Sequence, residues 1–358
     1  MKKRALLISI FLLIAITLIA CGGENTSEQP TNEQETADNK LKVYTTIFPL
    51  EDFTKKIGGD LVDVESIFPP GADAHTYEPT TKTMVDIAKS NGFIYSGVGI
   101  ESSVQQIEEA LVKEKVVFID AGKGVELLTN NHDDEAPADE HADHEDDAHT
   151  DEDAGHEDDT HTDEHANHED DAHADEDAAH DHGDNDPHVW LDPILSITLA
   201  ENIKNALVEL NPDGKETFEA NFQQLKTQLK DLDQSFTDII SKSDKKEILV
   251  SHAAYGYWEK RYGIEQISVL GLSPTEEPSQ KELQNIIETA KEHNLHYIIF
   301  EANVSSNVTD IVQTEIGAEA LTLSNLETVT DEDLKNNEDY FSIMKKNLET
   351  LETALSNK

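Results

Sequence analysis

Short apolar runs alternate with stretches of helical apolar spacing in two regions of the chain, residues 41–119 and 247–358. Runs of this length predict buried strands, and the spacing between them predicts amphipathic helices. Such alternation is typical of parallel sheets with helices on their faces. In the first region we expect strands at 41–47, 61–68, 92–95 and 115–119, and helices at 48–57, 80–90 and 101–113. In the second we expect strands at 247–250, 266–269, 297–300 and 320–323, and helices at 255–262, 280–292, 307–316 and from about 338.

Two longer helical patterns lie between these regions, at residues 193–210 and 214–241. At about 1.5 Å per residue, the second is long enough to reach from one region to the other. The pattern therefore predicts two α/β lobes joined by a helix that limits hinge motion. We expect the lobes to span 41–212 and 244–358, with the connecting helix at 213–243.

The start of the chain has the pattern of a secretory signal. A basic beginning precedes an apolar run at residues 5–20, as in signal peptides. The run ends in Leu18-Ile-Ala-Cys21, which looks like a lipobox, so we expect residues 1–20 to be removed and a diacylglyceryl group to be attached to Cys21. A plain transmembrane anchor is the alternative, but the run is short for about 30 Å of hydrocarbon. The mature protein is therefore expected on the extracytoplasmic face of the cell membrane, anchored by lipid.

Composition narrows the chemistry of the rest. Residues 21–40 are almost entirely polar and are expected to form a flexible tether. Cys21 is the only cysteine, which excludes an internal disulfide and a zinc site built from several thiolates, so a metal here must use His, Asp or Glu. The formal net charge of −48 argues against nucleic acid, whose phosphates require Lys and Arg, and agrees with a cationic ligand.

An acidic, histidine-rich insert interrupts the first lobe at residues 131–186. It contains no Lys or Arg, it holds eleven of the 16 histidines, and a twelve-residue unit that begins at His144 recurs from His156 and from His168. Such a composition cannot bury enough surface to fold, so we expect disorder and weak metal binding at many interchangeable positions. Residues 161–165 spell the H-x-x-E-H of some zinc peptidases, but that chemistry needs a packed helix, so we do not expect a peptidase.

Four side chains that could bind a metal lie at junctions between strands and helices. His75 follows the second predicted strand, His188 precedes a helix, His252 follows a strand, and Glu301 follows the apolar strand at 297–300. Any one of them alone would more often be a capping or hydrogen-bonding residue. Because α/β sheets bind ligands at the carboxyl ends of their strands, four such residues, two per lobe, predict one shared site in the cleft. Three imidazoles and a carboxylate in a tetrahedral set suit zinc.

At these positions the chain resembles a known family, the solute-binding proteins of zinc and manganese ABC importers, and within it the zinc branch. The resemblance is carried by His75-Thr-Tyr-Glu-Pro79, Asp186-Pro-His-Val-Trp-Leu-Asp-Pro193 and Ser251-His-Ala-Ala-Tyr255. The lipobox and the acidic insert complete it, and it covers nearly all of the chain from Leu41 onward. It implies two pseudo-symmetric lobes joined by a long backbone helix, with metal at their interface and small opening motions.

The resemblance also implies roles for individual residues. His75, His188 and His252 stand where the family places its three imidazole ligands. Glu301 is assigned as the fourth ligand, a position at which the family varies between carboxylate and water, because the family's aspartate position falls on the serines at 305–306. Manganese-preferring relatives usually have a carboxylate where His252 stands, so the third imidazole favours Zn²⁺ over Mn²⁺. The implied partner is an ABC permease. We expect the protein to be a monomer and not an enzyme.

Alternative functions remain open at this stage. The favoured one is high-affinity capture of extracellular zinc and its delivery to an ABC permease, and a manganese receptor of the same importer family is a variant of it. A second is a surface adhesin that sequesters metal without a transporter. A zinc hydrolase would need an open coordination position and a general base, and a fourth protein ligand argues against it. Because imidazoles must be neutral to bind metal, affinity is expected to fall below about pH 6.5.

Overall fold

The computed structural model describes residues 40–129, 185–302 and 306–356. All the helices and strands described below belong to one compact unit, Leu41–Lys358.

Several of the sequence predictions fall outside the described residues. These are the signal peptide at 1–20, the lipid anchor at Cys21, the tether and most of the acidic insert. In the part of the chain that the structure describes, no helix combines the length and the apolar content needed to cross a membrane.

The N-terminal lobe is built on four parallel strands in the order β2-β1-β3-β4. The central strand β1 has four of its five side chains buried, as expected for a parallel strand that is covered on both faces. The elements, in chain order, are β1 (Leu41–Thr45), α2 (Phe48–Gly58), η1 (Gly59–Leu61), β2 (Val62–Ser66), α3 (Thr81–Ala88), β3 (Gly92–Tyr95), α4 (Val104–Leu111) and β4 (Val117–Asp120).

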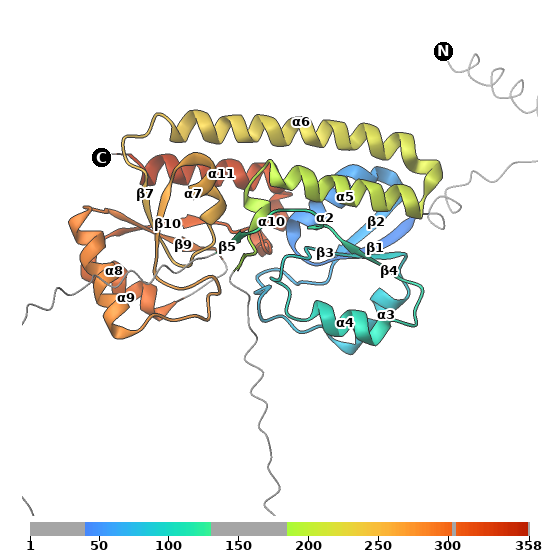
Figure 1. Ribbon diagram of the computed structural model, residues 1–358, viewed down its shortest axis with the longest axis horizontal. Helices are drawn as coiled ribbons and strands as arrows, with labels where there is room; N and C mark the ends of the chain where they lie inside the picture. The colour runs from blue at the N-terminus through green and yellow to red at the C-terminus, as the bar shows by residue number, and fades with distance from the viewer. Residues whose placement is uncertain (1–39, 130–184, 303–305, 357–358) are drawn as a thin grey trace, which may run out of the picture. The chain divides into compact units, whose positions relative to one another are not determined.

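The C-terminal lobe repeats this plan with four parallel strands in the order β10-β9-β7-β8. Helices α8 and α9 pack together beside this sheet (Figure 1), around a second apolar core that also includes Leu249 of the first strand and Ile298 of the third. The elements are β7 (Glu247–Val250), α7 (Gly256–Tyr262), β8 (Glu265–Ser268), α8 (Gln280–Glu292), β9 (Tyr297–Glu301), α9 (Asn307–Ile316), β10 (Glu319–Leu323), α10 (Asp331–Asn336) and α11 (Tyr340–Ala354).

A long helix, α6 (Lys215–Ile240), runs along both lobes (Figure 1). It follows α5 (Leu195–Leu210) and the short turn η3 (Pro212–Gly214), and its 26 residues span about 39 Å. It packs on α2 and α5 of the N-terminal lobe and on α7 and α11 of the C-terminal lobe. The contact is continuous because buried side chains recur every three or four residues: Phe218, Phe222, Leu225, Leu229, Leu232, Phe236 and Ile240. The prediction of two parallel-sheet lobes joined by a long helix is confirmed.

The end of the acidic insert differs from the sequence prediction. The structure pairs β6 (Asn185–Asp186) antiparallel with β5 (Leu128–Thr129), so the last two residues assigned to the insert belong to the fold. Asp186 is 1% exposed. The acidic sequence around Asp186 did not predict its burial, because composition does not reveal that one carboxylate has buried hydrogen-bond donors. A short turn, η2 (Val189–Leu191), follows and leads into α5.

The two lobes share one apolar core. Its buried members include Ile47 and Phe53 of the N-terminal lobe and Val250, Trp258 and Leu323 of the C-terminal lobe. Because protein interiors are closely packed, a continuous core of this kind resists large separation of the lobes. The carboxyl ends of both sheets meet beside this core, where the predicted metal ligands lie.

Candidate metal centre

His75 lies in the loop between β2 and α3. Its main-chain N–H donates to Asp73 Oδ1 at 2.8 Å, which forms the local turn that Asp favours. Further along the loop, the ring of Tyr77 packs edge-on against Phe68 with their centroids 4.9 Å apart. These contacts hold the loop, and the His75 residue is only 6% exposed.

His188 stands between β6 and η2 and is completely buried. Asp186 Oδ1 accepts one hydrogen bond from the main-chain N–H of His188 at 2.9 Å and lies 2.8 Å from its ring Nδ1. The carbonyl of Asp186 in turn accepts from the hydroxyl of Tyr257 at 2.8 Å. A carboxylate on Nδ1 fixes the ring tautomer and leaves Nε2 free to bind a metal.

His252 follows β7 and is also completely buried. Its ring Nδ1 lies 2.6 Å from Glu301 Oε1. The same oxygen accepts from the hydroxyl of Tyr255 at 3.3 Å. Glu301, the last residue of β9, therefore stands behind the imidazole and directs Nε2 away from itself.

Glu327 is a fourth side chain beside these three imidazoles, and it was not predicted from the sequence. It lies in the segment between β10 and α10 and is 3% exposed. Its Oε2 accepts from the main-chain N–H of Ala74 at 3.3 Å, beside His75, and its own carbonyl accepts from Phe48 N–H at 2.9 Å. A segment of the C-terminal lobe thus reaches the N-terminal lobe at the place where His75 stands.

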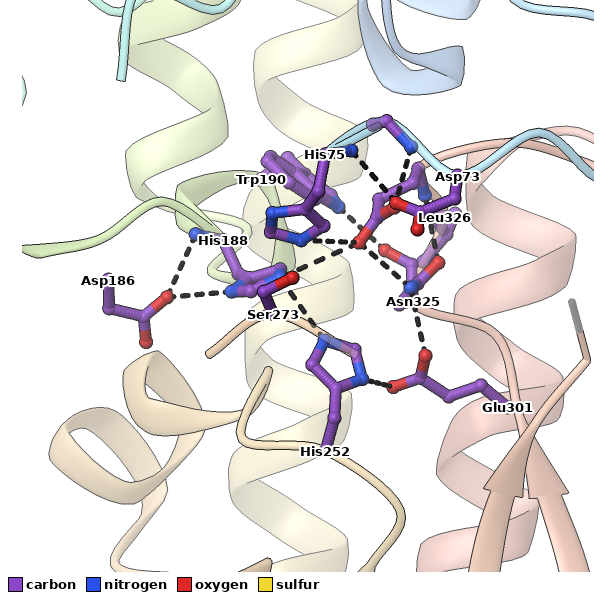
Figure 2. Close-up of polar contacts among 12 residues, drawn as sticks. Asp73, His75, Asp186, His188, Trp190, His252, Ser273, Glu301, Asn325 and Leu326 are labelled. Carbon is purple, nitrogen blue, oxygen red and sulfur yellow. Dashed lines mark hydrogen bonds and ion pairs between the residues drawn. The ribbon is translucent and has the colours of Figure 1, made fainter. Parts of the chain in front are cut away.

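The four groups converge on one point between the lobes. The Nε2 atoms of His188 and His252 are 3.4 Å apart. Glu327 Oε1 lies 3.6 Å from Nε2 of His75 and 3.6 Å from Nε2 of His188. One ligand atom of each residue lies within 4.8 Å of the others, and Figure 2 shows the three imidazoles turned toward one another. A tetrahedron with bonds of about 2.1 Å has edges of about 3.4 Å, so the set fits a four-coordinate divalent cation.

The electrostatics also favour a cation. Burial disfavours the charged form of His188, but its contacts with Asp186 and Glu327 outweigh burial and raise the pKa of His188 to about 10. Burial disfavours the Glu327 carboxylate as well, yet His188 and His75 hold the pKa of Glu327 well below its usual range. The centre therefore stabilises positive charge among its carboxylates.

A cavity of about 170 Å³ adjoins the centre on the side of His75. Its lining comes from both lobes and includes His75, Gly99, Asn185, Ser273 and Glu276. Because the other imidazoles are completely buried, this cavity is the approach that the described residues offer to a small ion.

The structure brings together three of the four residues that the sequence singled out. His75, His188 and His252 lie in one group with Glu327, whereas Glu301 is not part of that group. A signal for Glu327 was present, because it follows the short strand at 320–323 much as Glu301 follows the strand at 297–300. The strand before Glu301 is the more apolar of the two, and strand apolarity alone therefore favours Glu301 over Glu327.

The family described as zinc-uptake complex component A, periplasmic, matches residues 43–354. The chain belongs to this family. The resemblance to the zinc branch of these solute-binding proteins is confirmed. The family consists of uptake components, not enzymes, as predicted.

Similar proteins include the high-affinity zinc uptake system protein ZnuA of Bacillus subtilis, which is 34% identical over 345 residues, covering 96% of this chain and 94% of that protein. The zinc-binding lipoprotein AdcA of Streptococcus pneumoniae is 33% identical over 351 residues, covering 98% of this chain. This chain spans only 60% of the length of AdcA. Among solved structures, the Zn(II)-bound ZnuA-like domain of S. pneumoniae AdcA has a TM-score of 0.66 and 31% identity, covering 89% of this chain and 100% of that domain.

Proposed function

We propose that this protein captures zinc outside the cell and delivers it to an ABC permease. The ion would be held by Nε2 of His75, His188 and His252 and by Oε1 of Glu327. The observation that carries the proposal is the convergence of these four buried atoms, with separations of 3.4 and 3.6 Å between neighbours. Membership of the zinc-uptake family supports it.

Zinc is preferred over manganese because of the ligand set. Three imidazoles and one carboxylate oxygen suit a tetrahedral, borderline-soft ion, whereas manganese favours sites that are richer in oxygen. Nδ1 of both His188 and His252 lies against a carboxylate, so their lone pairs point into the centre. Two lone pairs at 3.4 Å repel each other unless a cation or a proton stands between them.

Delivery adds two expectations that concern the rest of the protein. We infer that a lipid on Cys21 anchors the monomer to the outer face of the membrane, and that the permease recognises the zinc-loaded form. For recognition to depend on zinc, the permease must distinguish the two states by contact energy. The continuous core of the two lobes supports small changes at the lobe faces rather than wide opening.

The binding test is competition between the purified protein and a chromophoric zinc chelator. His75→Ala and His252→Ala should each weaken zinc binding by at least about hundredfold, because each removes one of four ligands. His296→Ala is the control, since this residue is exposed and does not belong to the converging group. Unchanged affinity in both ligand variants would contradict the assignment of the site.

The delivery test uses growth of cells in zinc-depleted medium. Cells without the protein should grow poorly, and added zinc should restore their growth. The wild-type gene should also restore growth, whereas a gene that carries His252→Ala should not. Cys21→Ser should release the protein from the membrane and weaken its support of growth. Normal growth without the protein, with less zinc on the cell surface, would favour the sequestering adhesin instead.

A further inference from the structure

Asn325 joins two carboxylates beside the metal centre. It lies just after β10 and is 6% exposed, and its amide Nδ2 donates to Glu301 Oε2 at 3.0 Å and to Glu327 Oε1 at 2.9 Å. Glu301 in turn contacts Nδ1 of His252. One amide group therefore links the orientation of the carboxylate that faces the centre to the orientation of an imidazole ligand (Figure 2).

The main chain around Asn325 holds this amide in place. Its Oδ1 accepts from the main-chain N–H of Glu327 at 3.1 Å. Leu326 between them has a φ of 60°, in the left-handed region that residues with a Cβ rarely adopt. The carbonyl of Asn325 accepts from the indole N–H of Trp190 at 2.7 Å. These contacts turn the amide of Asn325 and the carboxylate of Glu327 to the same side of the segment.

The two oxygens of Glu327 consequently have different surroundings. Oε1 receives the amide of Asn325 and faces Nε2 of His75 and of His188. Oε2 receives the main-chain N–H of Ala74 at 3.3 Å. With Oε2 held by the His75 loop, one oxygen is directed at the centre, and together with three imidazoles it completes a set of four ligands.

We propose that Asn325 determines the metal preference of the centre, by restricting Glu327 to one coordinating oxygen and by holding Glu301 against His252. This inference rests on the proposed function, because it presupposes a cation bound by the four groups. Zn²⁺ commonly binds four ligands in a tetrahedron, whereas Mn²⁺ favours octahedral sites with more oxygens. The amide on Oε1 fixes the Glu327 carboxylate in the orientation in which Oε2 faces the Ala74 N–H. It therefore disfavours the ion that would gain from a second oxygen.

The test compares the affinities of the full protein for Zn²⁺ and Mn²⁺ in the wild type and in Asn325→Ala. The matched control is Asn347→Ala. Asn347 is also buried and holds the same segment, but through the main-chain N–H and carbonyl of Ser324, at 2.9 and 2.7 Å. We expect the ratio of zinc to manganese affinity to fall by about tenfold or more in Asn325→Ala and to stay within about twofold of the wild type in the control.

A second readout follows the coordination itself. X-ray absorption of the manganese-loaded Asn325→Ala protein should show more oxygen neighbours than the manganese-loaded wild type. Without the amide on Oε1, the Glu327 carboxylate can rotate away from the Ala74 N–H and offer both oxygens. A residue that only stabilised the fold would lower both affinities and leave the number of neighbours unchanged. That outcome would refute the proposal.

A milder variant guards against loss of folding. In Asn325→Ser the hydroxyl can still accept from the Glu327 N–H in a similar turn, but it is too short to donate to both carboxylates, so the same fall in the affinity ratio is expected. An unchanged ratio in a folded Asn325 variant that still binds zinc would overturn this inference alone. If the wild type failed to bind zinc tightly, the proposed function itself would fail.

Discussion

The indole Nε1 of Trp258, on α7 of the C-terminal lobe, donates a hydrogen bond to the main-chain carbonyl of Leu191 at 2.7 Å, and both residues are completely buried. The neighbouring Tyr257 donates to the carbonyl of Asp186. Two adjacent side chains of one helix therefore hold both ends of the segment that carries His188. This relationship couples the position of an imidazole ligand to the C-terminal lobe.

We expect Trp258→Phe to lower the free energy of unfolding of the metal-free protein by about 1–3 kcal/mol, because it leaves the buried Leu191 carbonyl without its donor. Urea denaturation measures this change. Tyr262→Phe is the control on the same helix. Its hydroxyl bonds to Asp233, which also pairs with Arg261, so the loss should stay below about 1 kcal/mol. Equal losses in the two variants would argue against the importance of the Leu191 contact.

The two carboxylates near the centre are expected to respond differently to amide substitution. Glu327→Gln removes the charge and the anionic ligand oxygen, and we expect zinc affinity to fall by at least about hundredfold. In Glu301→Gln the amide oxygen can take the same place beside Nδ1 of His252, so we expect a smaller loss of about tenfold. Chelator competition measures both values.

A crystal of the zinc-loaded protein with an anomalous signal gives a direct check. The ion should lie about 2.0–2.2 Å from Glu327 Oε1 and well beyond bonding distance from Glu301. A larger loss in Glu301→Gln than in Glu327→Gln, with the ion beside Glu301, would show that Glu301 is the fourth ligand.

The sequence predicts the histidines of the site better than it predicts which carboxylate, Glu301 or Glu327, joins them. Apolar periodicity predicted the sheets and the helix α6, because these elements bury regular stripes of side chains. The position of three histidines at junctions singled out three of the four side chains that converge. The choice between two carboxylates depends on the left-handed turn at Leu326 and on the hydrogen bonds of Asn325. The bond between Asn325 and Glu327 is local. The position of Glu327 beside His75 depends on long-range contacts, such as the bond of its Oε2 with the Ala74 N–H, and no local pattern of residues encodes these.

Zinc binding should release a proton at neutral pH. Because the pKa of His188 is raised to about 10, the metal-free centre holds a proton that zinc must displace. We expect about one proton per zinc at about pH 7, and apparent affinity that rises about tenfold per pH unit up to about pH 10. This range lies well above the value of about 6.5 expected from an ordinary histidine. Calorimetry in buffers of different ionisation enthalpy measures the release, and binding without any release would contradict the prediction.

The stability of the metal-free protein should depend on the same proton. The pKa of His188 is higher in the folded protein than the value of about 6.5 in an unfolded chain. A raised pKa contributes stability that is complete below about pH 6.5 and is lost as the pH rises through about 10. We therefore expect the free energy of unfolding to fall across this range. Asp186→Asn, which removes a partner of the charged ring, should show a smaller fall, and zinc-loaded protein should lack the step.

The tight zinc site should survive removal of the acidic insert. Thr129 and Asn185 face each other across the antiparallel pair of β5 and β6, and a two-residue turn such as Asn-Gly commonly joins two such strands. Replacing residues 130–184 by Asn-Gly should retain the fold and the affinity of the tight site, because none of the four converging groups lies in that segment.

Eleven histidines leave with the segment, so only weak additional binding should disappear from a zinc titration of the shortened protein. The shortened protein is compared with the full-length His75→Ala variant. This variant should lose the tight site and keep the weak binding, since His75 belongs to the converging group. The reverse pattern, tight binding that leaves with the segment and persists in His75→Ala, would place the principal zinc site in the insert rather than between the lobes.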